Sequence, residues 1–282
     1  MKPKRILIAS DIHLAHIDWY GVKTDERVAK FISDVEAEYE KEPFEALLLL
    51  GDYALDFWQW SIKGCYLREG ISNAGRFAKD FLARLEKYPF AVRAIAGNHE
   101  QYGEENFRRL VGHSRTGLYD AGEVLFVLLD NFAANLDPDF HSDGTFTGTD
   151  VSRVEKLLAD YPDKKLVLCA HHFDPANESE AFRELLKNEP RLLCLFGGHV
   201  HLSRIVDLGE DCGNKKLIYT GNYSYSKEKD PASSFWGFRE VYLDETGLTT
   251  RYITPESVYV SPVTNETTVH AYGKQDEVII HF

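Results

Sequence analysis

The chain has 282 residues, of which 44% are hydrophobic and 27% charged, and its 32 Lys and Arg against 45 Asp and Glu give a net charge of −13 with histidines neutral. This composition is typical of a globular protein and excludes a largely disordered or collagen-like chain. So negative a charge argues against a protein that grips the nucleic-acid backbone or an anionic membrane, because both tasks require clustered Lys and Arg.

The first two hundred residues alternate short apolar runs with amphipathic stretches, which predicts alternating strands and helices. Strands are expected at Ile6–Ala9, Ala46–Leu50, Phe90–Ala96, Val124–Leu129, Leu166–Ala170 and Leu192–Phe196. Helices are expected over Val28–Tyr39 with Thr24 as N-cap, Phe77–Leu85, Val151–Leu158 and Ala181–Leu186. This alternation favours α/β layering with a sheet built largely of parallel neighbours.

After His201 the pattern changes to strand-like segments separated by turn residues. Strands are expected at Lys216–Thr220, Gly237–Leu243 and Thr249–Ile253, with Asp244–Gly247 as a hairpin connection, and the tail alternates apolar and polar residues near Val258–Val260 and Val278–Ile280. We therefore predict one domain over residues 1–254 and a β-rich extension over residues 255–282 that packs on it.

Residue types that bind metals stand directly after five of the predicted strands. They are Asp11 and His13, Asp52, Asn98 and His99, His171 and His172, and His199 and His201. In α/β sheets, sites form beyond the carboxyl ends of strands, so these side chains are expected to converge although they lie far apart in sequence. The Asp-x-His and His-x-His spacings put both side chains of each pair on one side of an extended segment. Glycines at positions 51, 97, 197 and 198 let the chain turn sharply where it leaves a strand.

Five motifs therefore occur in a fixed order, each after a predicted strand. They are Ser10-Asp11-Ile12-His13, Gly51-Asp52, Gly97-Asn98-His99-Glu100, His171-His172 and Gly198-His199-Val200-His201. Each motif is weak by itself, but the ordered set resembles the calcineurin-like metallophosphoesterases. The resemblance covers residues 5 to about 205 and implies an α/β fold, a four-layer α-β-β-α sandwich of two mixed sheets flanked by helices.

The resemblance also implies a pair of metal ions held by seven residues. One ion would be held by Asp11, His13, Asp52 and His201, and the other by Asp52, Asn98, His171 and His199, with Asp52 bridging. Mixed nitrogen and oxygen ligands without a thiolate suit Mn, Fe or Zn. Two divalent ions, two aspartates and a bridging hydroxide leave a charge of about +1, which still attracts a phosphate and which an Asp at position 98 would cancel.

The implied reaction is hydrolysis of a small phosphodiester or phosphomonoester, in which the hydroxide shared by the metals attacks phosphorus. His99 would be the catalytic histidine that is not a ligand, and it would protonate the leaving alkoxide, because imidazole ordinarily titrates near neutral pH. A nuclease of the same superfamily is one alternative, which the acidic charge disfavours. A scaffold is the other, since a retromer subunit resembles this family, but here every ligand position is occupied by a suitable residue.

Two positions leave alternatives open. Many relatives have Asp or Asn three residues after the bridging Asp, where it contacts the catalytic histidine, whereas this chain has Leu55 there and Asp56 one residue later. Whether Asp56 orients His99 is therefore open. At the fourth motif either His171 or His172 can be the ligand, and we favour His171 because it comes immediately off the strand.

Several other residues are candidates for the neighbourhood of the site. The aromatic cluster Phe57, Trp58 and Trp60 follows the bridging Asp and either lines a substrate pocket or packs inside a long loop. Asn222 follows a predicted strand and is expected to border the site.

The remaining expectations concern partners and location. The four cysteines form no C-x-x-C pair and are too few for a disulfide scaffold, so we expect reduced thiols. The apolar run after the first basic residues is too short for a signal-peptide core, which predicts a cytoplasmic protein. The expected partner is a small phosphate-ester substrate, with neither extended nucleic acid nor a membrane.

Overall fold

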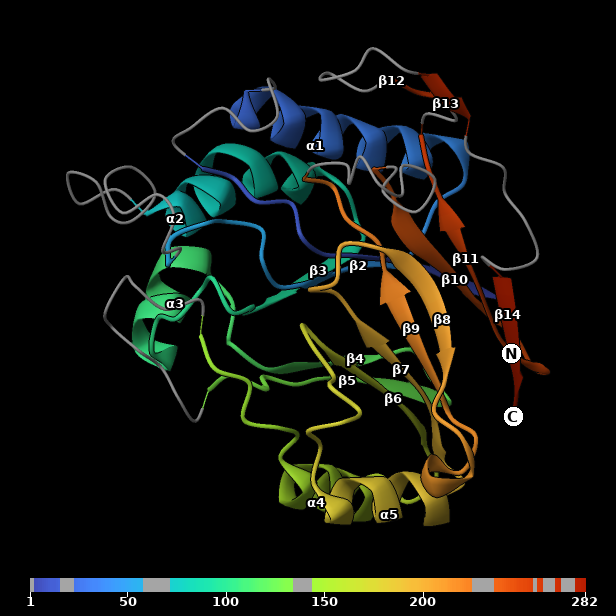
Figure 1. Ribbon diagram of the computed structural model, residues 1–282. Helices are drawn as coiled ribbons and strands as arrows, with labels where there is room; N and C mark the ends of the chain where they lie inside the picture. The colour runs from blue at the N-terminus through green and yellow to red at the C-terminus, as the bar shows by residue number, and fades with distance from the viewer. Residues whose placement is uncertain are drawn as a thin grey trace.

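Two six-stranded sheets pack face to face, and helices cover the outer face of each, so the molecule has four layers (Figure 1). This computed structural model describes residues 3–15, 23–57, 72–133, 144–224, 236–255, 258–260, 267–269 and 277–282. The expected α-β-β-α sandwich of two mixed sheets is confirmed.

The first sheet has the strand order β14-β11-β10-β1-β2-β3. The bounds are β1 Lys4–Ala9, β2 Ala46–Leu50, β3 Ala91–Ile95, β10 Phe238–Leu243, β11 Gly247–Ile253 and β14 Glu277–His281. β1, β2 and β3 are parallel neighbours, whereas β10, β11 and β14 are joined antiparallel. The predicted hairpin connects β10 to β11, where the amide of Asp244 donates to the carbonyl of Gly247.

The second sheet has the strand order β4-β5-β6-β7-β9-β8. The bounds are β4 Gly117–Asp120, β5 Val124–Leu128, β6 Lys165–Ala170, β7 Leu192–Gly197, β8 Ser203–Asp207 and β9 Lys216–Thr220. Its four inner strands are parallel, and the edge strands β4 and β8 are antiparallel to their neighbours. A separate ribbon pairs β12 (Val258–Val260) with β13 (Thr267–Val269).

The helices are divided between the two outer faces. The helices are α1 Thr24–Lys41, α2 Asn73–Arg76 and α3 Glu104–Val111 on the first sheet, and α4 Val151–Asp160 and α5 Glu180–Asn188 on the second (Figure 1). Alternation along β2 explains the layering, because successive strand residues face opposite sides. Leu47 and Leu49 lie in the core beneath α1, whereas Leu48 and Leu50 lie in the core between the sheets.

The structure differs from the sequence-based expectation at two helices. α2 continues as a π-helical turn over Phe77–Phe81 and a 3-10 helix over Leu82–Lys87, so the single helix predicted there is irregular. The N-cap of α1 is Lys23, and Thr24 instead donates from Oγ1 to the carbonyl of Ala15 at 2.7 Å. The hydroxyl therefore ties the start of α1 to the chain that leaves β1.

Several elements were not predicted. Among them are α3, the edge strands β4 and β8, and β13. α3 buries only Phe107 and Val111, which is too short an apolar pattern to identify a helix from sequence. β8 is a five-residue edge strand without a fully buried residue, so it carries no periodic signal.

The described surface gives two further observations. No helix in the described ranges is both long and apolar enough to span a bilayer.

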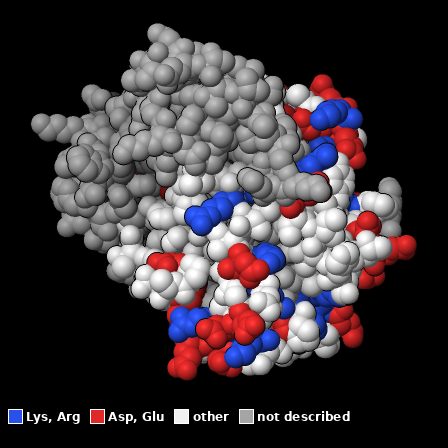
Figure 2. Space-filling view, turned by 45° about the vertical axis from the view of Figure 1, so that its right-hand side comes forward, with Lys and Arg blue, Asp and Glu red and all other residues white. Residues whose placement is uncertain are grey.

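On the face shown in Figure 2, acidic and basic side chains are interspersed over the lower part of the molecule.

Candidate metal centre

The candidate metal ligands lie where strands from both sheets end. β1, β2 and β3 are parallel and in register, so the residues that follow them emerge at one edge of the first sheet. In the second sheet Ala170 pairs with Gly197, so β6 and β7 end side by side. The amide of Gly198 donates to the carbonyl of His171 at 2.7 Å, which joins the two chain segments as they leave the sheet.

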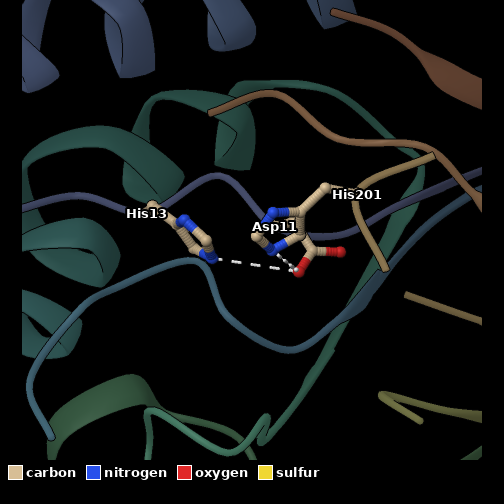
Figure 3. A group of neighbouring side chains, drawn as sticks. All are labelled: Asp11, His13 and His201. Carbon is tan, nitrogen blue, oxygen red and sulfur yellow. Dashed lines mark ion pairs between the residues drawn. The ribbon is translucent and has the colours of Figure 1, made fainter. Parts of the chain in front are cut away.

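Asp11, His13 and His201 form the first group of donors (Figure 3). Nε2 of His201 lies 3.1 Å from Oδ1 of Asp11, and Nε2 of His13 lies 3.8 Å from the same oxygen. The three ligand atoms are all within 4.8 Å of one another. His13 from the first motif and His201 from the last motif thus lie beside the same carboxylate, that of Asp11.

Asp52 lies at the middle of the cluster. Its Oδ2 is 3.6 Å from Nε2 of His13, 3.1 Å from Nε2 of His171 and 3.7 Å from Nε2 of His99. One buried carboxylate oxygen therefore faces imidazoles from three separate strand ends. This is the position expected of a ligand that bridges two ions.

Asn98 completes the second group of donors. Its Oδ1 lies 2.9 Å from Nε2 of His171 and 3.0 Å from Nδ1 of His199. Ligand atoms of Asp52, His171 and His199 also lie within 4.8 Å of one another. All seven predicted ligands therefore belong to one continuous cluster.

The chemistry of this donor set fits metal ions. Nitrogen atoms of imidazoles and oxygen atoms of carboxylates point at one another over distances that a metal ion can bridge, and both are ligands of transition metals. Oδ1 of Asp11 belongs to a fully buried carboxylate and faces Nε2 of His201 and of His13, so a cation at this point would compensate the cost of burying its charge.

The backbone at the cluster is strained. Six non-glycine residues of the described chain have positive φ, and the five other than Asn214 are predicted ligands: Asp11 (55°), His13 (55°), Asp52 (52°), His199 (68°) and His201 (58°). Left-handed conformations cost of order 1 kcal/mol each for such residues and persist where surrounding contacts enforce them. Contacts in the fold therefore hold these residues in conformations that cost free energy, and in these conformations their side chains meet in the cluster.

Two glycines allow the ligand segments to approach closely. A Cβ at Gly97 would lie 2.1 Å from Oδ1 of Asp52, and a Cβ at Gly198 would lie 2.7 Å from Oδ2 of Asp11. Only glycine fits at either position without displacing a predicted ligand.

Glu100 holds two of the ligand loops together. Its buried carboxylate accepts the amides of Gly97 (2.8 Å), Asp52 (2.9 Å) and Ala54 (2.9 Å). Burial and the charge of Asp52 raise the pKa of Glu100 to about 8, although these amides oppose the rise. Glu100 thus fixes the Asp52 backbone relative to the segment that carries Asn98.

Neighbouring charges shift the pKa values of several residues in the cluster. Burial alone would raise the pKa of Asp11, but the neighbouring His201 lowers it to about 2. Burial would likewise lower the pKa of His171, but the charge of Asp52 raises it to about 9. Burial lowers the pKa of His13 to about 4 and that of His199 to about 3. Without metal, positive charge therefore concentrates on His171 beside Asp52.

Arg27 supports the first donor group from behind. This side chain on α1 is 1% exposed, and its Nη2 donates to the carbonyls of Ile12 (2.9 Å) and His13 (2.7 Å). Burial lowers the pKa of Arg27 to about 9. Its sequence position on a helix gave no signal of this role, because an Arg near a helix start is ordinarily exposed.

His99 is oriented by a backbone carbonyl. Its Nδ1 donates to the carbonyl of Phe57 at 2.6 Å, and its amide donates to Oδ1 of Asp52 at 3.1 Å. The aromatic ring of Phe57 is buried in the core and packs against Tyr102, and Phe57 is not among the residues that line the cavity beside the donor cluster. Trp58 and Trp60 lie outside the described residues.

Asp56 does not orient His99 through its side chain. Its carboxylate accepts the Ser72 hydroxyl (2.8 Å), the amides of Asn73 (2.7 Å) and Ala74 (2.9 Å), and the Tyr102 hydroxyl (2.7 Å). Asp56 therefore anchors the start of α2, and burial raises its pKa.

His171 and His172 have separate places. Nδ1 of His171 donates to the carbonyl of Leu50 at 2.7 Å, which leaves Nε2 directed at Asp52 and Asn98. The His172 ring instead lies tilted by 46° against the ring of His199, with the ring centroids 4.3 Å apart, and lines a cavity of about 360 Å³. This geometry favours His171 as the ligand.

The cavity opens directly on the donor cluster. Five of its lining residues are predicted site residues: Asp52, Asn98, His99, His199 and His201. Phe132, Phe146 and Asp174 also line it, and no sequence motif had indicated them. Asn222 borders the site as expected, because its Nδ2 donates to the carbonyl of His201 at 2.8 Å.

Comparison with known proteins gives a family match. The sequence matches the family described as calcineurin-like phosphoesterase over residues 4–203. No curated protein matches the sequence.

Three solved structures have a similar fold. A dimetal phosphatase from Danio rerio has a TM-score of 0.63 and 13% identity, with 95% of this chain and 99% of that chain covered. Purple acid phosphatase PPD1 from yellow lupin has a TM-score of 0.56 and 13% identity, with 99% of this chain but 54% of that chain covered, so the present chain spans about half its length. The Plasmodium protein GAP50, described as the anchor in the inner membrane complex, has a TM-score of 0.54 and 12% identity, with 97% and 90% covered.

Proposed function

The chain belongs to the calcineurin-like phosphoesterase family, and we propose that it is a dinuclear metal-dependent enzyme that hydrolyses a small phosphodiester or phosphomonoester. The observation that carries this proposal is the convergence of seven donor side chains on Asp52 and Asn98 beside an open cavity. Burying so many nitrogen and oxygen donors that face one another, on strained backbone, costs free energy. Metal binding gives a reason for this cost.

The proposed ligand sets are those of the sequence analysis. Asp11, His13, Asp52 and His201 would hold one ion, and Asp52, Asn98, His171 and His199 the other. When bound, two such ions supply a hydroxide at neutral pH and neutralise charge that develops on the phosphate. Mn, Fe or Zn fit these nitrogen and oxygen donors.

The chain's own residues would then bind the ester and move a proton. Asn98 contributes a neutral amide oxygen, so the donor set carries two negative charges rather than three. Because the Phe57 carbonyl can only accept, Nδ1 of His99 carries a hydrogen, and when Nε2 carries a second hydrogen, as in the imidazolium form, it would give that proton to the leaving oxygen. Glu100 and Arg27 would keep the ligand loops in place without touching substrate.

Metal analysis combined with a hydrolysis assay tests the proposal. Protein purified without chelator is expected to contain about two metal equivalents and to hydrolyse bis(4-nitrophenyl) phosphate with stimulation by added Mn²⁺ or Zn²⁺. Asp52→Asn should lose both properties. Asp207→Asn is the matched control, because Asp207 is an exposed residue of β8 paired with Lys216.

A non-catalytic scaffold is the second candidate. It is favoured by the similarity to a Plasmodium protein described as an anchor. Absence of bound metal together with no metal-stimulated hydrolysis would support the scaffold and contradict the enzyme.

We also propose that the substrate is a small molecule. The net charge of −13 disfavours extended nucleic acid, and therefore a nuclease, as well as an anionic membrane. Failure to retard a single- or double-stranded oligonucleotide at low salt would agree with this expectation.

A further inference from the structure

Part of the lining of the cavity beside the donor cluster comes from residues other than the predicted site residues. They are Phe132, Gly144, Phe146, His172 and Asp174. These residues come from two loops of the second sheet, one after β5 and one after β6. An ester held at the metal ligands would therefore extend one substituent against aromatic rings.

The aromatic rings contact one another in edge-to-face geometry. The Phe132 and Phe146 centroids are 6.1 Å apart with planes at 74°, and the Phe146 and His172 centroids are 5.3 Å apart with planes at 70°. Phe132 also lies 6.4 Å from the ring of His199. The wall thus runs without interruption from a predicted ligand to Phe146.

Buried hydrogen bonds hold this wall in place. Asn131, which is 1% exposed, donates from Nδ2 to the carbonyl of His172 (2.7 Å) and to Thr149 Oγ1 (3.3 Å). Its own carbonyl accepts the amide (2.9 Å) and the hydroxyl (3.0 Å) of Thr147. Hydrogen bonds therefore join the segments that carry Phe132, Phe146 and His172 in the absence of a ligand.

The charge of the wall disfavours a dianion more than a monoanion. Among the described residues that line the cavity, none is Lys or Arg, and Asp174 adds a carboxylate. Asp174 is held in its loop by the amide of Ala176 (3.1 Å) and Nδ2 of Asn177 (2.6 Å). A phosphomonoester dianion would bring a second negative charge toward this carboxylate, whereas a phosphodiester brings only one.

We propose that the substrate is a monoanionic phosphodiester in which the ester group that stays on phosphorus is a flat aromatic ring, and that this ring lies against Phe132 and Phe146. The inference rests on the proposed phosphoesterase function and narrows it to one substrate class. Phe146 determines specificity by contact with the ester group, and Asp174 determines it by charge.

Two substrates with one leaving group separate the aromatic contact from the chemistry. Phenyl 4-nitrophenyl phosphate and methyl 4-nitrophenyl phosphate are both monoanions that release 4-nitrophenol. With the wild-type metal-loaded protein, the phenyl ester should have a KM roughly tenfold lower, as expected for burial of an aromatic ring in an aromatic pocket. Phe146→Ala should remove that difference, and Phe146→Tyr, which keeps the ring, should retain it.

Phe282→Ala serves as the matched control. Phe282 is a half-buried residue at the chain end that packs against Lys165 and lies outside the cavity lining. The phenyl preference should be unchanged in this variant. Equal KM values for the two substrates in the wild type, or a preference that persists in Phe146→Ala, would overturn the aromatic assignment.

The charge assignment has its own test. Asp174→Asn keeps the size of the side chain and removes its charge, so kcat/KM for dianionic 4-nitrophenyl phosphate should rise about threefold more than that for methyl 4-nitrophenyl phosphate at low salt. Equal effects on both substrates would overturn the role of Asp174.

A binding measurement distinguishes failure of this inference from failure of the proposed function. Titration calorimetry should show diphenyl phosphate binding roughly tenfold more tightly than dimethyl phosphate, with the preference lost in Phe146→Ala. If no ester is hydrolysed but this preference is found, the catalytic proposal fails while the pocket assignment stands. If the esters are hydrolysed but neither KM nor binding distinguishes phenyl from methyl, the pocket assignment fails and the phosphoesterase stands.

Discussion

Nε2 of His171 lies 3.1 Å from Oδ2 of Asp52, although the two residues follow strands of different sheets. The adjacent His172 points its ring along the cavity wall instead. We therefore expect His171→Ala to lose about one of two metal equivalents, because one ion keeps its other ligands, and to lose hydrolysis. His172→Ala should keep both equivalents by elemental analysis. Metal loss in His172→Ala but not in His171→Ala would contradict this assignment.

His99 is expected to matter most for poor leaving groups. Since general acid catalysis contributes roughly 100-fold or more, His99→Ala should slow hydrolysis of an alkyl ester by at least about that factor. A 4-nitrophenyl ester should be affected much less, because its leaving group needs no proton. The metal content should be unchanged, and His281→Ala on the exposed end of β14 is the control. An equal loss on both esters would point to a structural role.

Asp56 is expected to contribute to stability rather than to chemistry. Removing its carboxylate leaves four buried donors around Ser72 and Tyr102 without their acceptor. Asp56→Ala should therefore lower the free energy of unfolding by about 3 kcal/mol, measured by urea denaturation. Asp207→Ala, at an exposed position, should change it by less than about 0.5 kcal/mol. Similar unfolding midpoints for both variants would argue against the anchoring role.

Gly97 is expected to be essential for placing Asp52. A methyl group there would lie 2.1 Å from Oδ1 of Asp52, so Gly97→Ala must push the central carboxylate away. We expect the variant to fold but to retain less than half of the bound metal. Gly103→Ala is the matched control, because nothing lies within 4 Å of a Cβ there. Full metal occupancy in Gly97→Ala would show that the loop adjusts without cost.

The metal-free protein is expected to lose stability in mild acid. His13 and His199 ordinarily titrate near pH 6.5 in an unfolded chain, whereas burial lowers their folded pKa values to about 4 and about 3. The unfolded chain therefore binds protons that the folded chain does not, and unfolding becomes easier as pH falls from about 6.5 to 4. His171 does not offset this loss, because its pKa near 9 makes its contribution constant below pH 6.5. The pKa of Glu100, raised to about 8, offsets part of the loss, whereas the pKa of His172, lowered by burial to about 4, adds to it.

Thermal unfolding of chelator-treated protein between pH 7 and 4.5 measures this effect. The midpoint should fall over this range, and the fall should be smaller in His13→Asn. His281→Asn should behave like the wild type, since His281 is exposed on β14. A midpoint independent of pH would contradict the buried neutral state of the two histidines.

Much of the fold was predictable because buried parallel strands are short, continuous apolar runs. Ala46–Leu50 was placed at its observed bounds for that reason. α3 and β8 were missed because each has too few buried residues to make a pattern. The division into two sheets depends on the alternation of side chains along each strand and on the order of the strands in each sheet. Alternation can be inferred from a short stretch of sequence, whereas strand order cannot.

The donor cluster was predictable because strand ends are visible in sequence and parallel strands end at one edge. The hydrogen-bond partner of His99 could not be predicted. It is the backbone carbonyl of Phe57, and every residue type has such a carbonyl. The cavity wall formed by Phe132 and Phe146 was missed for another reason. Aromatic residues in a loop look the same in sequence whether they fill a core or line a pocket.

The division of the donors between two sheets also bears on how the protein is made. Asp11, His13, Asp52 and Asn98 follow strands of the first sheet, whereas His171, His199 and His201 follow strands of the second. Neither sheet by itself offers a complete coordination shell for either ion. During synthesis the nascent chain therefore could not bind the proposed pair of ions until residue 201 has emerged and the two sheets have docked. Binding of both ions would then be a late step that depends on correct assembly of the two sheets.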